Sequence, residues 1–232
     1  MAKYPVLTDE MFREMISSDA GIREARYATG YGHWIDDASV TDGYYVNWPD
    51  YRSKWEISDE QRELALQRFE ERKAETIDYC SRPGVLTWHR MGMDYEPTVE
   101  GGIGNYRIRT TFKDKTGHVW FIEIHPRYNK SHNGDDSLGF YGEVYDVSWN
   151  ERAMKEYTER YDALIEKYGG WWKAPTNERP HLPMTRYERV ESGEPFTYAT
   201  VLAWVNRRFK TDYKEMFLER YFLNCDDVIS VC

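Results

Sequence analysis

The stretch YRIRTTFKDKTGHVWFIEIH, from Tyr106 to His125, predicts two strands joined by a tight turn. Its centre, DKTG at 114–117, is typical of a type I turn followed by a glycine in the left-handed region, which makes a bulged hairpin. This register gives three apolar-face pairs: Ile108 with Ile124, Thr110 with Ile122, and Phe112 with Trp120. A slip of one residue would mix apolar and charged side chains on both faces, so the alternation selects the bulged register.

The opposite face of the same hairpin is charged. Arg109 is expected opposite Glu123, and Arg107 opposite His125. The segment 105–132 holds six basic residues against two acidic ones, a net charge of +4, together with three histidines. Because the whole chain has a net charge of −9, this segment is a local inversion of sign.

Two interpretations of this face involve no catalysis. The first is a solvated face, because antiparallel sheets usually have one wet side and cross-strand Arg–Glu pairs often cover it. The second is a binding site for an anionic ligand or an acidic partner, since arginine forks and histidine suit phosphate and carboxylate groups. The candidate ligand-binding residues are Arg107, Arg109, Arg127, Lys130 and His132.

A third interpretation is catalytic. Glu123 and His125 lie two residues apart on one strand and project the same way, about 7 Å apart. Such a base and acid can flank a phosphodiester, with Arg107 and Arg109 stabilising the charge that develops. This geometry would permit RNA cleavage by a Glu/His pair without a metal ion.

Helical patterns precede the strands. Thr8 is a predicted N-cap, with Leu7 stapled onto Phe12, for a helix that ends before Gly21. SDEQ at 58–61 is a capping box for a helix that continues to Cys80. The stripe expected to be buried on this second helix consists of Leu66, Phe69, Ile77 and Cys80.

Strands and then further helices follow. VLTWHRM at 85–91, the two hairpin strands and FYGEVYDVSW at 140–149 make four expected strands. A helix is predicted from 150 to Gly169, its C-cap, and two more over 196–209 and 211–223. We therefore expect one α+β domain over 1–232, with a helical and loop part at 1–83, a sheet at 84–149 and a helical part at 150–232. Its centre is an antiparallel four-stranded meander at about 85–149, packed by the helices.

Composition narrows the classes of function. The charge of −9 argues against general DNA binding, which needs a strong basic excess. No apolar run approaches the roughly 18 residues that span a bilayer, and the first residues lack the apolar core of a signal peptide. Three cysteines without CxxC spacing suit a reducing compartment, so a cytoplasmic location is expected. The sequence shows no metal-binding or cofactor spacing, and it gives no indication of oligomeric state.

The leading hypothesis is a cytosolic, non-enzymatic binding protein of the inhibitor or accessory type. The chain contains 19 Tyr, 9 Trp and 9 Phe, and aromatic residues and arginines dominate interface hot spots. A macromolecular protein partner is expected, with a phosphate-containing ligand on the hairpin as a further possibility. The alternative is a metal-independent phosphodiesterase or ribonuclease-like enzyme that uses Glu123 and His125 with Arg107 and Arg109.

Overall fold

Contacts divide the chain into two compact units. A computed structural model describes residues 6–27, 33–36, 52–55, 57–91, 101–104, 106–128 and 137–232. The first unit contains 1–81 and 219–228, and the second contains 82–218 and 229–232. The boundary after residue 81 lies close to the predicted end of the N-terminal helical part at 83. The single-domain assignment stays a prediction.

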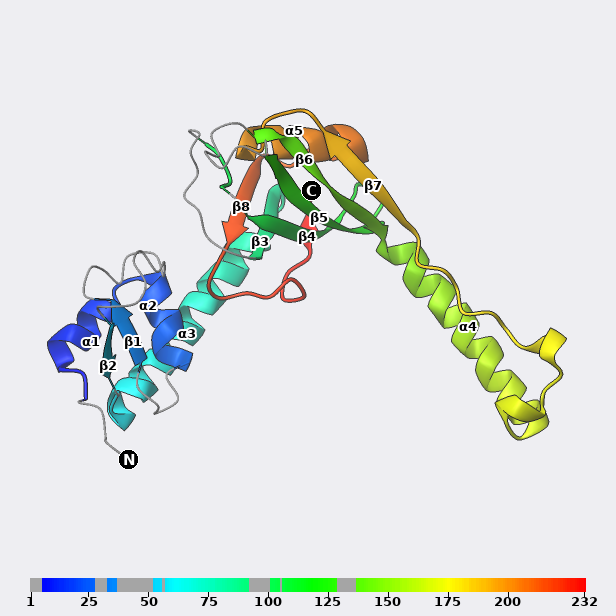
Figure 1. Cartoon of the computed structure of the whole chain (residues 1–232), viewed down its shortest axis with the longest axis horizontal. Helices are drawn as coiled ribbons and strands as arrows, with labels where there is room; N and C mark the ends of the chain where they lie inside the picture. The colour runs from blue at the N-terminus through cyan, green and yellow to red at the C-terminus, as the bar shows by residue number, and fades with distance from the viewer. Residues whose placement is uncertain are drawn as a thin grey trace. The chain divides into compact units, whose positions relative to one another are not determined.

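The first unit is mainly helical. Its elements are α1 (Asp9–Met15), α2 (Asp19–Tyr27), α3 (Asp59–Cys80) and the antiparallel pair β1 (His33–Asp36) and β2 (Arg52–Trp55) (Figure 1). The predicted N-cap is confirmed, since the Thr8 side chain accepts a hydrogen bond from the Met11 N–H. Leu7 and Phe12 lie in the same buried cluster, as the staple predicts.

The prediction for the first helix was incomplete. The helix α1 ends at Met15, and a second helix, α2, begins at Asp19 and runs through Gly21. The hydroxyl of Ser18 accepts a hydrogen bond from the Gly21 N–H at 3.0 Å, which satisfies one of the free donors at this helix start. The serine before the acidic residue was the signal for this second start.

The long helix α3 follows its predicted bounds. The capping box of Ser58 and Gln61 is present, and Cys80 is the last residue of the helix. Phe69 and Cys80 are buried as predicted, whereas Leu66 is exposed. Ala65 takes the place of Leu66 in the core, because its small side chain packs directly into the cluster of Leu7 and Phe12.

Residues 219–228 complete the first unit. The ring of Phe222 meets Phe69 edge-on, with 5.4 Å between the ring centroids. The buried carboxylate of Glu219 accepts hydrogen bonds from the N–H groups of Tyr221, Phe222 and Leu223. One side chain thereby satisfies three backbone donors in a segment that lies in no helix or sheet.

The second unit contains a mixed sheet of seven strands, which confirms the α+β class and exceeds the predicted four strands. The strand order is β7-β6-β5-β4-β3-β8, and β9 pairs with β4 in parallel. The bounds are β3 (Val85–Met91), β4 (Arg107–Lys113), β5 (Val119–Tyr128), β6 (Ser137–Asp146), β7 (Tyr187–Ser192), β8 (Glu215–Glu219) and β9 (Ser230–Val231). The predicted meander is the central part of this sheet, from β3 to β6.

The hairpin of β4 and β5 has the predicted register. Ile108 pairs with Ile124, Arg109 with Glu123, and Phe112 with Trp120. Gly117 has a φ of +82°, in the left-handed region that the bulged turn requires. Ile108, Phe112, Ile122 and Ile124 have no exposed surface, so the apolar face is the core face as predicted.

Three strands lie in the part of the chain that was predicted to be helical, 150–232. β8 replaces the helix expected at 211–223, because the N–H groups of Lys214 and Glu215 donate to the carbonyl of Gly84 and continue into pairing with β3. Tertiary pairing overrides local helix propensity here. β7 carries charged residues at three of its six positions and has only Val190 buried, so it lacks the alternation of a typical strand.

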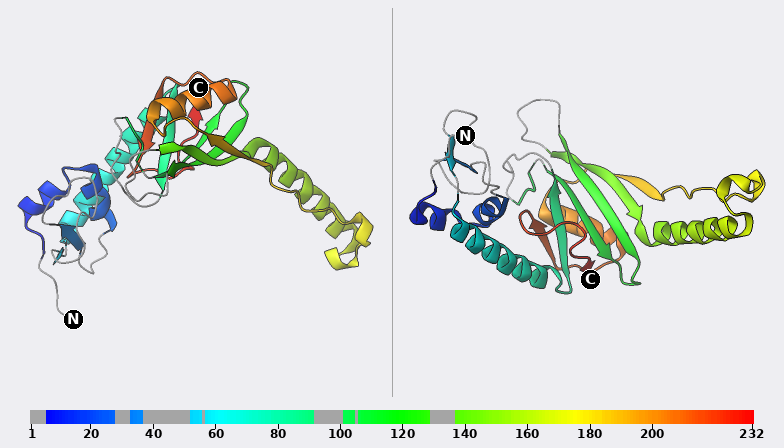
Figure 2. Two further views of the ribbon diagram at one scale, coloured as in Figure 1. Left: turned by 45° about the horizontal axis from the view of Figure 1, so that its top comes forward. Right: turned by 90° about the horizontal axis from the view of Figure 1, so that it is seen from below.

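Two helices belong to this unit. The helix α5 (Tyr198–Phe209) lies across one face of the sheet and buries Val201, Trp204 and Val205 (Figures 1 and 2). The helix α4 (Val147–Tyr168) projects from the end of β6 and ends at the predicted C-cap, Gly169 (Figure 1). The chain then forms two short 3-10 turns, η1 (Trp171–Lys173) and η2 (Thr176–Glu178), before it returns to β7. None of the described helices has both the length and the apolar character needed to cross a bilayer.

The close contact between β5 and β6 depends on Gly142. A Cβ atom at this position would lie 2.0 Å from the carbonyl oxygen of Glu123 and 2.8 Å from the Cα of Ile124. Gly193, at the end of β7, has nothing within 4 Å of the same added atom and an ordinary φ. The two glycines therefore form a matched pair for testing the sheet.

We predict that Gly142→Ala lowers the free energy of unfolding by about 3 kcal/mol, because the backbone of β5 must move to admit the methyl group. The matched variant Gly193→Ala is expected to leave stability unchanged or raise it by up to about 1 kcal/mol. Urea denaturation followed by circular dichroism measures both. Equal stability of the two variants would contradict the described β5–β6 contact.

Candidate functional site

The sheet has a face that points away from α5, and four of the predicted site residues lie on it: Arg107, Arg109, Glu123 and His125. We call it the outer face, and its described side chains include Arg107, Arg109, Phe121, Glu123, His125, Tyr141, Glu143, Tyr145, Tyr187 and Arg189. They come from four neighbouring strands, β4 to β7, and their positions follow from the alternation of side chains along each strand. The hairpin face that the sequence predicted is thus continued by two further strands.

Glu123 is the centre of the polar contacts on the hairpin. Its Oε1 lies 3.2 Å from the Nη1 of Arg107 in an ion pair and is hydrogen-bonded to the Nε2 of His125 at 3.2 Å. Arg109, its register partner, makes no hydrogen bond or ion pair within the described residues, and the Nε of Arg109 is buried without a partner. Glu123 therefore pairs with Arg107, its diagonal neighbour on β4. Arg109, which stands directly opposite Glu123, makes no such contact within the described residues.

The predicted acid–base pair is in direct contact. Glu123 and His125 were expected to stand about 7 Å apart across a substrate, but the structure joins their side chains by the 3.2 Å hydrogen bond. The imidazole of His125 also stacks on the ring of Tyr141, with centroids 5.1 Å apart and planes inclined by 12°. Glu123 and His125 therefore touch each other instead of flanking a substrate, and they also contact Arg107 and Tyr141, respectively.

The remaining predicted ligand-binding residues lie toward the end of β5. Arg127 pairs with Glu191 of β7 at 2.5 Å, and both side chains are more than half exposed. Lys130 and His132 lie outside the described residues, so their placement at this face stays a prediction. The structure therefore brings Arg107, Arg109, Glu123 and His125 together and directs Arg127 to the sheet edge.

The strands β6 and β7 add aromatic and charged groups that the hairpin alone did not predict. Tyr145 stacks on Tyr187, with centroids 5.6 Å apart, and its hydroxyl donates to Glu143. Arg189 is 82% exposed, and its Nε lies 3.9 Å from the Oε1 of Glu143, a loose contact. Glu143 and Glu191 offset part of the positive charge that the sequence concentrated in the hairpin.

The hydrogen bond to Glu143 raises the pKa of Tyr145 to about 12, and burial and the charges of Glu143 and Glu123 add to the effect. The neutral phenol donates to the carboxylate, so ionisation removes the bond and places two negative charges together. The tyrosine is therefore a neutral donor over the whole physiological pH range.

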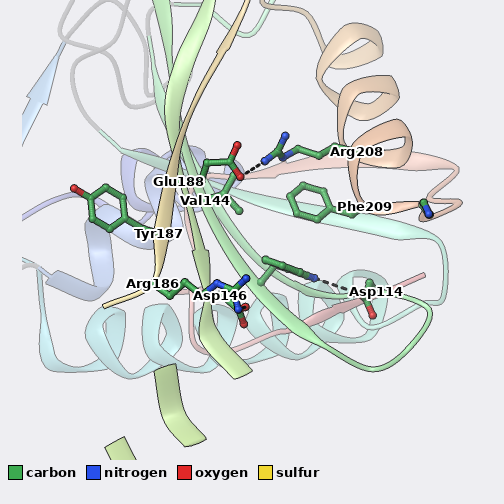
Figure 3. A pocket seen from close by; sticks show the side chains of 10 residues that line it. Asp114, Val144, Asp146, Arg186, Tyr187, Glu188, Arg208 and Phe209 are labelled. Atoms are coloured by element: carbon green, nitrogen blue, oxygen red, sulfur yellow. Dashed lines mark hydrogen bonds and ion pairs between the residues drawn. The ribbon is translucent and has the colours of Figure 1, made fainter. Parts of the chain in front are cut away.

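A pocket of about 410 Å³ opens on the opposite face of the sheet, beside the C-terminal end of α5, and sequence reasoning missed it. Its sheet side consists of Trp120 and Val144, and its helix side consists of Arg208, Phe209 and Lys210. Asp114, Asp146, Arg186, Tyr187 and Glu188 complete the wall. Figure 3 shows Glu188 and Arg208 facing each other, whereas the ring of Tyr187 points away to the outer face.

The two aspartates of the pocket have structural roles. Asp114 accepts from the Trp120 Nε1 at 3.0 Å and from Thr116 and His118 in the hairpin turn. Burial alone would raise the pKa of Asp114, but hydrogen bonds from Thr116, Trp120 and the backbone outweigh it and hold that pKa below its ordinary value. Asp146 is the N-cap of α4 and also binds the Nε2 of His118.

Comparisons of the chain with protein families, with curated proteins and with solved structures found no match. Within the described residues, no group of three or more His, Cys, Asp or Glu side chains is arranged to hold a metal ion. The functional inference below depends on the outer face and the pocket.

We predict that the contribution of Tyr145 to stability depends on pH. Because its pKa is raised from 10.0 to about 12 in the folded state, its hydrogen bond to Glu143 stabilises the fold below pH 10 and is lost as the pH rises toward 12. Urea denaturation of wild type and Tyr145→Phe should give a stability difference that shrinks over this interval. In a Glu143→Gln background the same comparison should show little change with pH. A difference that shrinks equally in both backgrounds would contradict this origin of the shift.

Proposed function

We propose that this chain is a cytoplasmic, non-enzymatic binding protein that holds an acidic surface of a protein partner on its outer face. In this proposal the protein is of the inhibitor or accessory type, because it acts by covering a surface of its partner and not by catalysing a reaction. The observation that carries the proposal is the unused arginine donors of the outer face beside exposed tyrosines. Tyr and Arg, together with Trp, are enriched among the residues that dominate binding at the centres of protein interfaces.

The donors of Arg109 and Arg189 support an acidic partner. Arg109 has no partner within the described residues, and Arg189 has only its loose contact with Glu143. A guanidinium group forms two parallel hydrogen bonds with a carboxylate, so each arginine can take an Asp or Glu side chain of a partner. A phosphate group presents the same acceptor geometry, and a phosphorylated partner segment therefore fits this proposal.

The exposed tyrosines support a macromolecular partner. Tyr141 is 46% exposed and Tyr187 is 49% exposed, on adjacent strands of an open sheet face. Aromatic rings on such a face offer a large contact area at a small entropic cost. The overall charge of −9 supports a protein partner over general DNA, since the phosphate backbone of DNA needs a strong basic excess.

We predict that a protein captured from a native lysate by the wild-type chain is lost from the variant Arg109→Ala/Arg189→Ala. The purified partner should bind this variant about tenfold more weakly or worse, because two charge-assisted contacts are removed. Raising the salt concentration should weaken the wild-type complex in calorimetry, since it screens exposed charges. Glu123 keeps Arg107 and His125 in the variant, so no carboxylate on the hairpin loses all its partners.

The matched control is Arg68→Ala/Arg207→Ala, which removes two exposed arginines elsewhere. It changes the net charge equally and should capture the same protein as wild type. The proposal fails when nothing is captured, or when the outer-face variant and the control behave alike.

The rival function is a metal-independent phosphodiesterase or ribonuclease-like enzyme. The observation that favours it is the hydrogen bond between Glu123 and His125, because a carboxylate that orients an imidazole is a common part of acid–base catalysis. Arg107 and Arg109 would then stabilise developing charge on the phosphate.

The enzymatic function predicts that wild type cleaves single-stranded RNA or a cyclic dinucleotide in the presence of a chelator. Glu123→Gln and His125→Ala should each lower the rate by about 100-fold or more. His181→Ala removes an exposed histidine elsewhere and should keep the activity. Such cleavage would replace the binding function as our conclusion, whereas full activity in Glu123→Gln and His125→Ala would exclude these residues from catalysis.

A further inference from the structure

The pocket beside α5 opens on the opposite side of the sheet from the outer face and has an apolar floor; Tyr187 borders both. The rings of Trp120 and Phe209 lie 5.2 Å apart and are inclined by 52°, and Val144 lies next to them in the pocket wall. The Nε1 of Trp120 already donates to Asp114, so the polar edge of the indole is satisfied. What the floor offers a ligand is therefore aromatic surface, in a cavity of the size that small molecules occupy.

The carboxylates around this floor are occupied by the protein itself. Asp114 accepts four hydrogen bonds within its own hairpin. Asp146 is bound by His118 and by the Trp149 N–H, and Glu188 is paired with Arg208 at 2.5 Å. These acidic groups have little capacity left for a cation or a donor.

The cationic groups are less occupied. Lys210 makes no ion pair within the described residues, and the Nη1 of Arg186 lies 3.4 Å from Asp146 while its side chain is 63% exposed. Lysine and arginine carry only donors, so the spare hydrogen-bonding capacity of the pocket is for acceptors. A ligand that satisfies it must bring oxygens with negative charge.

The backbone of Lys210 indicates that its side chain matters. Lys210 has a φ of +54° and is the single non-glycine residue with positive φ in the described part of the chain. It is the C-cap of α5, a position that glycine takes at lower cost. Non-glycine residues in such sparsely populated conformations cluster at ligand sites and switch regions, which agrees with a site at this pocket.

We propose that this pocket binds a small organic anion, a flat apolar ring that bears a carboxylate or phosphate group. The ring packs against Trp120 and Phe209, and the acid group binds the ammonium of Lys210. Arg186 supplies a second positive charge in the wall. The site lies on the opposite face of the sheet from Arg109 and Arg189, the arginines of the proposed partner surface, while Tyr187 borders both.

Four probes with one ring system test the proposal: 1-naphthoate, 1-naphthyl phosphate, neutral 1-naphthylmethanol and cationic 1-naphthylmethylammonium. Calorimetry on the full chain should show that at least one anionic probe binds about tenfold more tightly than the neutral and cationic ones, the effect of one charge-assisted contact. The comparison between the two anions distinguishes a carboxylate from a phosphate ligand. The indole N–H resonance of Trp120, assigned with Trp120→Phe, should shift on binding.

The decisive variant is Lys210→Gly. It should fold and raise the melting temperature by roughly 2–4 °C, because glycine relieves the left-handed backbone. It should also lose about tenfold in affinity for the preferred anion and keep its weak affinity for the neutral probe. Lys155→Gln removes an exposed lysine of α4 and should leave affinity for all four probes unchanged.

Three results would overturn the proposal. The first is that no probe binds at millimolar concentration. The second is that the neutral or the cationic probe binds as tightly as both anions. The third is that Lys210→Gly and Lys155→Gln have the same effect on binding of the anions. Each result is independent of partner capture by the outer face, so this proposal and the proposed function can fail separately.

Discussion

The carboxylate of Asp114 is the constraint on which the second unit depends. It accepts from Thr116 and His118 in the turn, and from the indole of Trp120 in the following strand. The turn is thereby closed in the form that gives the bulged register, and this register sends Ile108, Ile122 and their neighbours to α5. A slip of one residue would flip one strand relative to the other and bring either Arg109 or Glu123 into the core, where an unpaired charge is very costly. The conformation of this turn therefore determines which face of the sheet packs against α5 and lines the pocket, and which face is the outer face.

The parts of the fold that could be predicted are those whose signals are local. Thr8, the capping box at Ser58 and the turn glycine Gly117 each depend on a few neighbouring residues, and all three are present. The strands β7, β8 and β9 depend on partners far along the chain, such as the carbonyl of Gly84 for Lys214. Their own residues lack a clear period, because β7 is charged and β9 has only two residues. The residues 211–223 have helix propensity, but part of this segment pairs with the edge of β3 and forms β8 instead.

The candidate site was predictable to the level of the face and no further. Alternation placed Arg107, Arg109, Glu123 and His125 on one side, but it could not decide which arginine Glu123 would bind. His125, which contacts Glu123, also stacks on Tyr141 of β6, so the arrangement of these side chains involves a strand outside the hairpin. The pocket combines the hairpin, the end of β6, β7 and the end of α5, which only the tertiary fold brings together. The one local signal was the sequence FKTD after α5, where a lysine stands at the position that usually belongs to glycine.

The pairing of β9 has a consequence for the order of folding. The N–H of Thr87 donates to the hydroxyl of Ser230, a contact between residues 143 positions apart, and Tyr213 donates to the carbonyl of Ser230 from the other side. Closing so long a loop has a large entropic cost, whereas the hairpin of β4 and β5 closes over the five residues 114–118. The central hairpin therefore forms early and β9 docks late. Until it does, the backbone groups of β3 and β4 that it covers are open to other strands, and a nascent or partly folded chain is most exposed to misassembly there.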